Sequence, residues 1–392
     1  MKIRLFPAFL LLCGLGWIAA ANAAEPAGAD LKAARAEAQK IIDKSVAYLK
    51  SKQQPDGGWQ TGNQPPAITA VVLKALVQEQ NIDAKTDFVK KGYAKLLTYQ
   101  LDSGGIYKDL LGNYNTAIAV SALAVADNPE FKPSIEKGVA YLKSLQWNET
   151  IQGGPKGEGH IDIGNPWYGG LGYSSKGRPD GSNTQLMLDA LHDAGIPAND
   201  PAYQAAVKFV SRLQNLSETN DQKWAGDDGG GIYSPANNGE SMAGEYVGSD
   251  GRRMLRSYGS MTYAMLKSYI YAGLTKDDPR VKAAWDWVRK NWTLQENPGM
   301  RFTGPQNAQY GLFYYYHTLA RALNAYNEPI IVDPQGNRHD WRVELIDALA
   351  KIQKADGSFV GEKRWMEDNP VLTTAYAILS LQEALKDMQA TK

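Results

Sequence analysis

Six times along this chain, an amphipathic helical segment ends near a glutamine, crosses a glycine-rich turn and enters a second helical segment. The clearest copy of this motif turn is the segment 53–59, which reads Gln-Gln-Pro-Asp-Gly-Gly-Trp. The six copies are anchored at Gln53, Gln100, Gln146, Gln214, Trp292 with Gln295, and Gln353. An internal repeat of this kind constrains the architecture before any single residue does.

Each residue type in the motif turn has a structural role. Gly57 permits backbone angles that a Cβ forbids, and the carboxylates of Asp56 and Asp356 can accept backbone N–H groups at the next helix start. Trp59 offers a large apolar face that can cover the end of the preceding helix. The amide of Gln53 has two donors and an acceptor, so it can tie one helix to a neighbouring repeat. We therefore interpret these residues first as structural staples.

The flanking segments share one register. The fourth residue before each anchor is apolar in all six copies: Leu49, Leu96, Leu142, Val210, Val288 and Leu349. In five copies a threonine precedes an apolar residue of the second helix by seven positions: Thr69, Thr116, Thr184, Thr262 and Thr374. Such spacing is typical of one buried helix face. Six helical hairpins predict an all-α fold, an (α/α)6 toroid with a double ring of about twelve helices; an open solenoid is the alternative.

The motif turn resembles the QW motif of the squalene-hopene cyclase and oxidosqualene cyclase superfamily. That superfamily shares its α/α-toroid with protein prenyltransferase β-subunits, and the likeness spans all six repeats. The stretch from Tyr258 to Tyr316 also resembles secreted bacterial proteins described as squalene-cyclase-like. The resemblance implies a toroid that processes or binds an isoprenoid, and fold alone does not specify the chemistry.

The N-terminus has the pattern of an export signal. Lys2 and Arg4 precede an apolar run, and an Ala-x-Ala site ends at Ala23. This pattern predicts a secretory signal peptide over 1–23, which would leave 392 − 23 = 369 residues. We expect a short tether over 24–34, one toroid domain over 35–392, and a periplasmic or secreted protein. No later apolar run has the length of a transmembrane span.

Charge and cysteine content exclude several classes of protein. Without Lys2 and Arg4, 42 − 2 = 40 basic residues face 42 acidic ones, which argues against a nucleic-acid partner. The single cysteine, Cys13, lies inside the signal segment. A zinc prenyltransferase needs a cysteine ligand, so that activity is excluded, and we expect neither a metal nor another cofactor.

Three insertions interrupt the repeat spacing, near 147–168, 234–256 and 327–339. Long excursions from a compact domain are often functional. The first two lie between a motif turn and its second helix, so we expect them at one rim of the ring, near the mouth of the central cavity.

The resemblance also implies a catalytic acid in an Asp-x-Asp-Asp run ahead of an inner helix, and this sequence has no such run. The nearest acidic pairs supply the catalytic candidates Asp227, Glu367 and Asp368. Aromatic faces can stabilise carbocations or stack on sugar rings. The ligand-binding candidates cluster before and along two second helices, with polar neighbours: Tyr258, Tyr310, Tyr314, Tyr315, His317, Asn115, Asn183 and Arg252.

Three functional hypotheses remain at this point. The first is an isoprenoid-processing enzyme with an atypical acid, and the second is a non-catalytic toroid that binds a lipid, a peptide or a partner protein. The third is a glycan-active enzyme, which would need two carboxylates facing each other about 5–10 Å apart. The expected ligand is accordingly a hydrophobic small molecule or a glycan.

Overall fold

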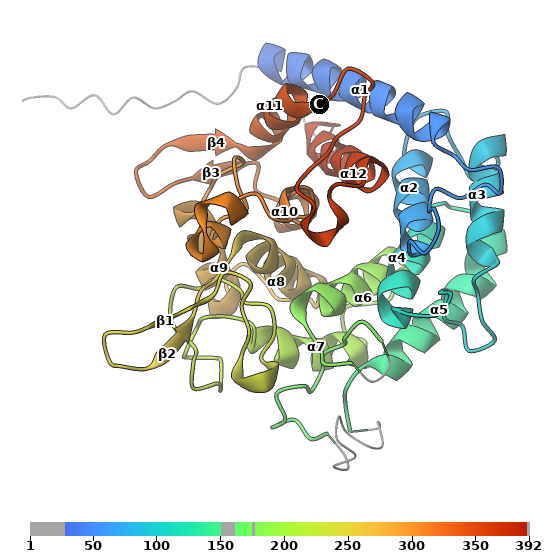
Figure 1. Cartoon of the computed structure of the whole chain (residues 1–392). Helices are drawn as coiled ribbons and strands as arrows, with labels where there is room; N and C mark the ends of the chain where they lie inside the picture. The colour runs from blue at the N-terminus through green and yellow to red at the C-terminus, as the bar shows by residue number, and fades with distance from the viewer. Residues whose placement is uncertain (1–27, 150–160, 175–176, 390–392) are drawn as a thin grey trace, which may run out of the picture.

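The computed structural model describes residues 28–149, 161–174 and 177–389, and these residues are mostly helical (Figure 1). The predicted signal peptide lies outside the described residues, as do 150–160 of the first insertion. Twelve α-helices occur in the described ranges: α1 Gly28–Ser51, α2 Ala67–Val77, α3 Asp87–Leu97, α4 Gly112–Ala124, α5 Lys132–Leu145, α6 Gly181–Asp193, α7 Pro201–Ser211, α8 Gly259–Tyr271, α9 Pro279–Lys290, α10 Leu312–Tyr326, α11 Trp341–Ile352 and α12 Pro370–Gln389.

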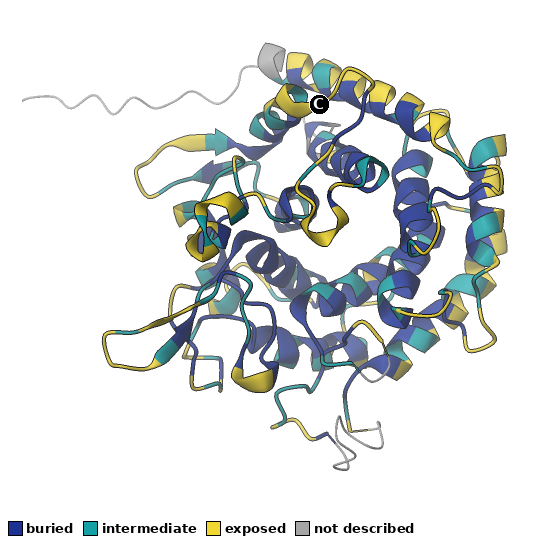
Figure 2. Ribbon diagram, viewed as in Figure 1, coloured by how far each residue is buried: buried dark blue, intermediate teal, exposed yellow. Residues whose placement is uncertain are grey.

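The even-numbered helices pack against one another in a cycle. From α2 to α12 each contacts the next, and α12 contacts α2. The odd-numbered helices flank this inner set, and α1 contacts both α11 and α12 (Figure 1). The architecture is compatible with an α-toroid. Figure 2 shows the inner helices almost wholly buried, whereas the outer helices keep an exposed face.

The predicted buried register is confirmed. Leu49, Leu96, Leu142, Val288 and Leu349 are fully buried, and Val210 is nearly so. The repeated threonine has a specific role in the motif turn. Its hydroxyl accepts the backbone N–H of the turn's last residues, as in the bonds from Trp59 N to Thr69 Oγ1 (2.8 Å) and from Phe359 N to Thr374 Oγ1 (3.0 Å). This bond fixes each turn to its own second helix.

The motif glutamines join neighbouring repeats, as the sequence predicted. Each side-chain amide donates to a main-chain carbonyl on the next outer helix. The pairs are Gln53 to Phe88 (2.7 Å), Gln100 to Ser134 (3.1 Å), Gln146 to Ala202 (2.9 Å), Gln214 to Arg280 (2.8 Å) and Gln353 to Ile41 (2.9 Å). The last bond connects the final repeat to the first.

The first glycine of the motif turn is required by both conformation and space. Gly57 has φ +96°, and a Cβ there would lie 2.6 Å from the carbonyl oxygen of Lys91 on α3. At Gly357 the corresponding values are +87° and 2.4 Å, to Lys44 on α1. A side chain is therefore excluded wherever the turn meets the next outer helix.

The N-terminal helix and two insertions differ in detail from expectation. Helix α1 begins at Gly28, within the segment expected to be a tether, because residues 31–37 are mostly strong helix formers. The second insertion contains the antiparallel pair β1 (Glu245–Val247) and β2 (Arg253–Leu255). The third contains β3 (Ile330–Val332) and all but the last residue of β4 (Arg338–Asp340), also antiparallel. Both hairpins project from the outer edge of the ring (Figure 1).

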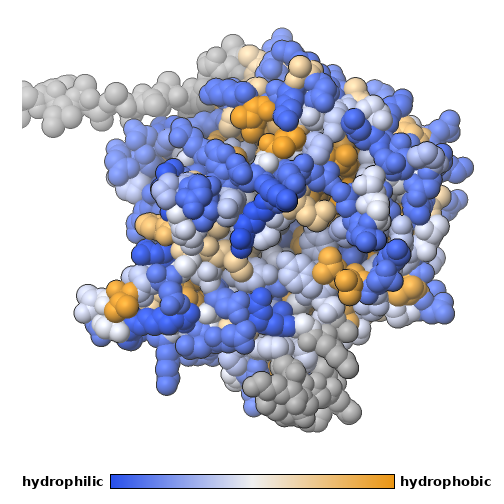
Figure 3. All heavy atoms as spheres, viewed as in Figure 1, coloured by the Kyte–Doolittle hydropathy of each residue, from blue (hydrophilic) through white to orange (hydrophobic). Residues whose placement is uncertain are grey.

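Within the described ranges, we find no helix with both the length and the apolar character needed to cross a membrane. The face shown in Figure 3 is mostly hydrophilic, with separate hydrophobic patches.

Candidate functional site

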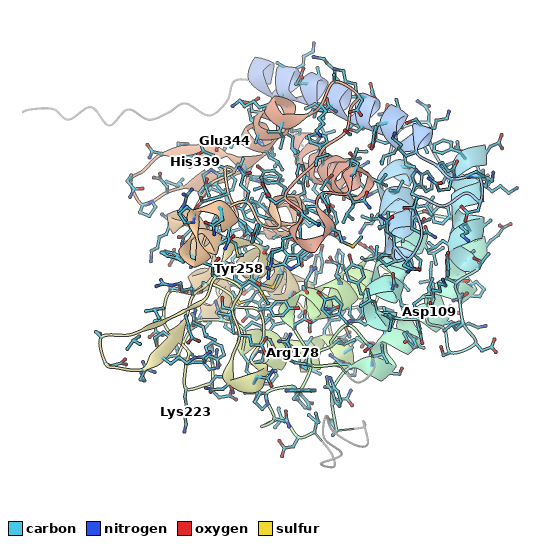
Figure 4. All side chains as sticks on the ribbon, viewed as in Figure 1. Asp109, Arg178, Lys223, Tyr258, His339 and Glu344 are labelled. Atoms are coloured by element: carbon cyan, nitrogen blue, oxygen red, sulfur yellow. The ribbon has the colours of Figure 1, made fainter. Side chains whose placement is uncertain are left out.

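Six tyrosines form a closed cycle near the N-terminal ends of the inner helices. In order they are Tyr114, Tyr173, Tyr233, Tyr258, Tyr314 and Tyr376, from α4, the segments before α6 and α8, the cap of α8, α10 and α12. We call this set the tyrosine cluster. Tyr258 is labelled beside α8 in Figure 4.

Each member of the tyrosine cluster interacts with the next. Ring centroids lie 6.1 Å apart for Tyr114 and Tyr173, and 6.3 Å apart for Tyr314 and Tyr376. Tyr233 and Tyr258 belong to one buried apolar cluster, and Tyr314 packs against it. Tyr233 also interacts electrostatically with Tyr173, and Tyr376 does so with Tyr114. Burial raises the pKa of Tyr233, Tyr258, Tyr314 and Tyr376, and it raises the pKa of Tyr114 to about 12. These five phenols therefore stay protonated at neutral pH.

Asp180 is a fully buried carboxylate beside this cluster. It caps α6, since its Oδ1 accepts the backbone N–H of Asn183 (2.9 Å) and the hydroxyl of Ser182 (2.7 Å). The side chain of the candidate Asn183 also donates to Asp180 Oδ2 (2.9 Å). Burial raises the pKa of Asp180, and its charge in turn helps raise the pKa of Tyr314. Asp180 therefore fixes the first residues of α6 beside the tyrosine cluster.

Glu367 is another buried carboxyl group beside the tyrosine cluster, three residues before α12 begins. Its Oε1 accepts the backbone N–H of Tyr314 (2.8 Å), at the start of α10, while Oε2 has no hydrogen-bond partner among the described residues. Burial raises the pKa of Glu367 to about 7. The two preceding residues, Trp365 and Met366, have φ values of +58° and +65°. Such left-handed angles are strained for these side chains and often occur at functional sites.

A network of buried charges lies deeper in the ring, toward the C-terminal ends of the inner helices. We call this set the floor network: Lys74, Asp189, Asp193, Lys267, Arg321 and Glu383. Lys74 pairs with Asp193 at 2.7 Å, Arg321 pairs with Asp193 at 2.8 Å, and Lys267 pairs with Asp189 at 2.7 Å. Burial would raise the pKa of Asp193, but Arg321 and Lys74 hold it well below its usual range. Buried ions need such pairing to offset desolvation.

His317 lies between the tyrosine cluster and the floor network. On α10 it follows Tyr314 by three residues and precedes Arg321 by four, so all three share one helix face. Its ring stacks on Tyr376 with centroids 5.4 Å apart. Burial, together with Arg321, lowers its pKa well below the usual value, so the imidazole is neutral. His317 is therefore well placed beside the tyrosine cluster.

Several predicted ligand-binding residues have structural roles instead. Asn115 accepts the backbone N–H of Ala67 (3.0 Å) and so fixes the start of α2 to α4. The hydroxyl of Tyr315 donates to the carbonyl of Thr293 (2.8 Å). Tyr310 packs against Trp365, with ring centroids 6.4 Å apart.

The remaining candidates are exposed. Asp227 accepts the backbone N–H (2.8 Å) and hydroxyl (2.6 Å) of Ser217, and these bonds lower its pKa. Arg252, near the end of the β1–β2 hairpin, pairs with Asp250 at 2.5 Å. Asp368 is also exposed, although its neighbour Glu367 is buried. The structure thus brings Tyr258, Tyr314, His317, Asn183 and Glu367 together, and places Asp227, Arg252 and Asp368 at the surface.

Sequence reasoning missed Asp180, Tyr114, Tyr376 and the whole floor network. A signal was present, because Lys74 and Lys267 interrupt otherwise apolar or uncharged second helices. Charged residues inside buried helices require partners. In the ranges that the structure describes, no group of three or more His, Cys, Asp or Glu side chains is placed to hold a metal ion.

No protein-family model matches this chain, and no curated protein matches its sequence. Solved structures do match in fold. The apo type II terpene cyclase MstE from Scytonema has a TM-score of 0.54 at 15% identity, covering 90% of this chain and 99% of the cyclase. An MstE variant in complex with its substrate, geranylgeranyl dihydroxybenzoate, gives 0.50 at 14% identity, covering 91% and 99%. An alpha-amylase from Clostridium perfringens gives 0.49 at 11% identity, covering 88% and 97%. At these identities, the similarity to the cyclase establishes the helical fold alone.

Proposed function

We propose that this chain is an exported, squalene-cyclase-like protein with an (α/α)6 toroid that binds an isoprenoid at the tyrosine cluster. The closed cycle of six tyrosines carries the proposal. The aromatic rings offer flat apolar faces to an alkene chain, and the hydroxyls offer hydrogen bonds to a polar head group. MstE, whose fold is similar, binds a substrate that combines a geranylgeranyl chain with a dihydroxybenzoate head.

The floor network limits how deeply an apolar ligand can enter. Lys74, Lys267 and Arg321 are paired with carboxylates and leave little exposed surface. An isoprenoid chain seated against them would desolvate charges without pairing them, which is unfavourable. The ligand therefore lies across the tyrosine cluster, above His317.

Binding is better supported than cyclisation started by alkene protonation. That reaction needs a strong acid, whereas the pKa of Glu367 is raised to about 7 and its Oε1 caps α10. Asp180 is likewise engaged as a helix cap, and Asp227 is exposed. We assign Glu367 and Asp180 to shaping the binding site.

The test is isothermal titration of the purified mature protein with geranylgeraniol. Tyr314→Ala and Tyr376→Ala should each weaken binding at least tenfold, because each removes one wall of the cluster. Tyr246→Ala is the matched control, since Tyr246 is exposed on the β1–β2 hairpin; it should leave binding unchanged, as should Asp227→Asn.

Equal affinity of the wild type and both cluster variants for geranylgeraniol would contradict the proposal that the ligand binds at the tyrosine cluster. Binding of maltotetraose or cellotetraose in place of geranylgeraniol would overturn the ligand class. A cyclised product on incubation with squalene or geranylgeraniol would overturn the binding-only role.

A further inference from the structure

The fifth repeat is joined to the sixth in a different way from the other repeats. Where the other motif turns use a glutamine amide, Trp292 donates its indole N–H to the side chain of Glu344 on α11 (2.9 Å). Glu344 also contacts His339 Nδ1 at 2.8 Å. Figure 4 shows His339 and Glu344 side by side. This junction therefore depends on side chains alone at the place where the others use a main-chain carbonyl.

A groove of about 700 Å³ lies at this junction. One part of its lining is apolar and includes Trp292, Leu294 and Tyr316. Ile352 and Val360 also line it, and they are 42% and 38% exposed. An apolar side chain seated in the groove would pack against these residues and lose water-exposed surface.

The other part of the lining is acidic. Glu344, Asp347 and Glu362 contribute three carboxylates, and Lys351 is the one lysine or arginine among the lining residues. No ion pair of Asp347 or Glu362 occurs in the part of the chain described here, and both are exposed. Carboxylates beside an aromatic face favour an ammonium or guanidinium group, through charge complementarity and cation–π attraction.

The length of the groove indicates the form of the ligand. Its wall on α11 runs from Glu344 to Ile352, which are eight residues apart, or about 12 Å of helix. An extended peptide rises about 3.3 Å per residue, so three to four residues match this wall. Alternating basic and apolar side chains would meet the carboxylates and the apolar lining in turn.

We propose that this groove binds a short basic segment of a partner polypeptide in extended form, separately from the tyrosine cluster. The carboxylates of Asp347 and Glu362 pair with its basic side chains. Trp292 packs against an adjacent side chain while its indole N–H holds Glu344 in place.

The probe is a dye-labelled acetyl-Lys-Leu-Lys-Leu amide, followed by fluorescence anisotropy on the full-length mature protein. The double variant Asp347→Asn/Glu362→Gln should raise the Kd at least tenfold, and raising the salt from about 50 to 200 mM should weaken wild-type binding. The control Asp102→Asn/Asp109→Asn removes two exposed carboxylates elsewhere and should leave the Kd unchanged. Melting temperatures confirm that each variant is folded.

Three results would overturn the proposal. The first is an unchanged Kd in the Asp347/Glu362 double variant. The second is equal binding of the corresponding Glu-Leu-Glu-Leu peptide. The third is full competition by spermidine at the peptide's own concentration, which would identify a site for small cations. None of these results depends on isoprenoid binding.

Discussion

Gln353 at the end of α11 donates a hydrogen bond to the carbonyl of Ile41 on α1, across 312 residues of sequence and 2.9 Å of space. The same amide lies 3.3 Å from the carbonyl of its own turn, at Gly357. One side chain thus shapes the last turn and attaches it to the first helix. Four other glutamines make the equivalent bond between consecutive repeats, so ring closure uses the same contact as ring propagation.

Removing the Gln353 amide should weaken the attachment of the last repeat to α1. Gln353→Ala removes the hydrogen bond between the last turn and α1, while the Gly357 carbonyl keeps the Ser45 hydroxyl as a donor. The substitution should lower the free energy of unfolding by about 0.5–1.5 kcal/mol in urea denaturation. Gln54→Ala is the matched control, because Gln54 bonds only locally, to the Lys52 carbonyl at 3.1 Å. Equal losses in the two variants would show that the bond across the ring adds nothing.

Alanine substitutions at two glycines distinguish the cost of a strained backbone angle from the cost of a steric clash. Gly357 and Gly336 have the same φ of +87°, but only Gly357 would place a Cβ 2.4 Å from Lys44 O. A Cβ at Gly336 meets nothing within 4 Å. Gly336→Ala should cost about 1 kcal/mol for its left-handed angle, and Gly357→Ala should cost clearly more. Thermal melts measure the difference, and similar melting temperatures would contradict the close approach.

Removing one cation from the floor network should lower the free energy of unfolding strongly. Arg321→Met leaves the carboxylates of Asp193 and Asp189 buried with one fewer cation, so we expect a loss of about 3–5 kcal/mol in chemical denaturation. Lys282→Met removes an exposed pair with Asp277 and should cost less than about 1 kcal/mol. A loss in Arg321→Met as small as in the control would mean that water reaches these charges.

Glu367 should make stability depend on pH near neutrality. Its pKa of about 7 in the folded protein exceeds the ordinary 4.5, so the folded state binds the proton more tightly. The resulting stabilisation is fully present below pH 4.5, declines as pH rises and is lost above pH 7. The gap between the two values corresponds to about 3 kcal/mol.

Glu367→Gln keeps the acceptor for the Tyr314 N–H and cannot ionise. Relative to wild type, it should therefore be more stabilising at pH 8 than at pH 5, by about 2.5 kcal/mol in denaturant titrations. Asp368→Asn, at the exposed neighbouring position, should show no such difference. A Glu367→Gln effect that is constant across pH would contradict a buried, titrating carboxyl group.

The sequence predicted the repeated elements well because their determinants are local. The motif anchors, the apolar position four residues before them and the repeated threonines all act within a turn or two of helix. The role of Gln53 in joining repeats could also be predicted, because a side-chain amide has two N–H donors. Its own turn takes one of them, through the Gly57 carbonyl at 2.8 Å, which leaves the other for a neighbouring repeat. Tyr258, Tyr314 and His317 could be selected by their density on two helices.

The sequence by itself determined a helical repeat protein with glycine turns and an apolar register, because periodicity and turn chemistry are properties of neighbouring residues. Only the tertiary structure decided which carboxyl groups are buried, since adjacent Glu367 and Asp368 face opposite environments. It also decided that Lys74 would meet Asp193, 119 residues away, and that six tyrosines would form one cycle. Burial and pairing between distant helices depend on how the repeats pack around the ring, and local sequence patterns do not determine that packing.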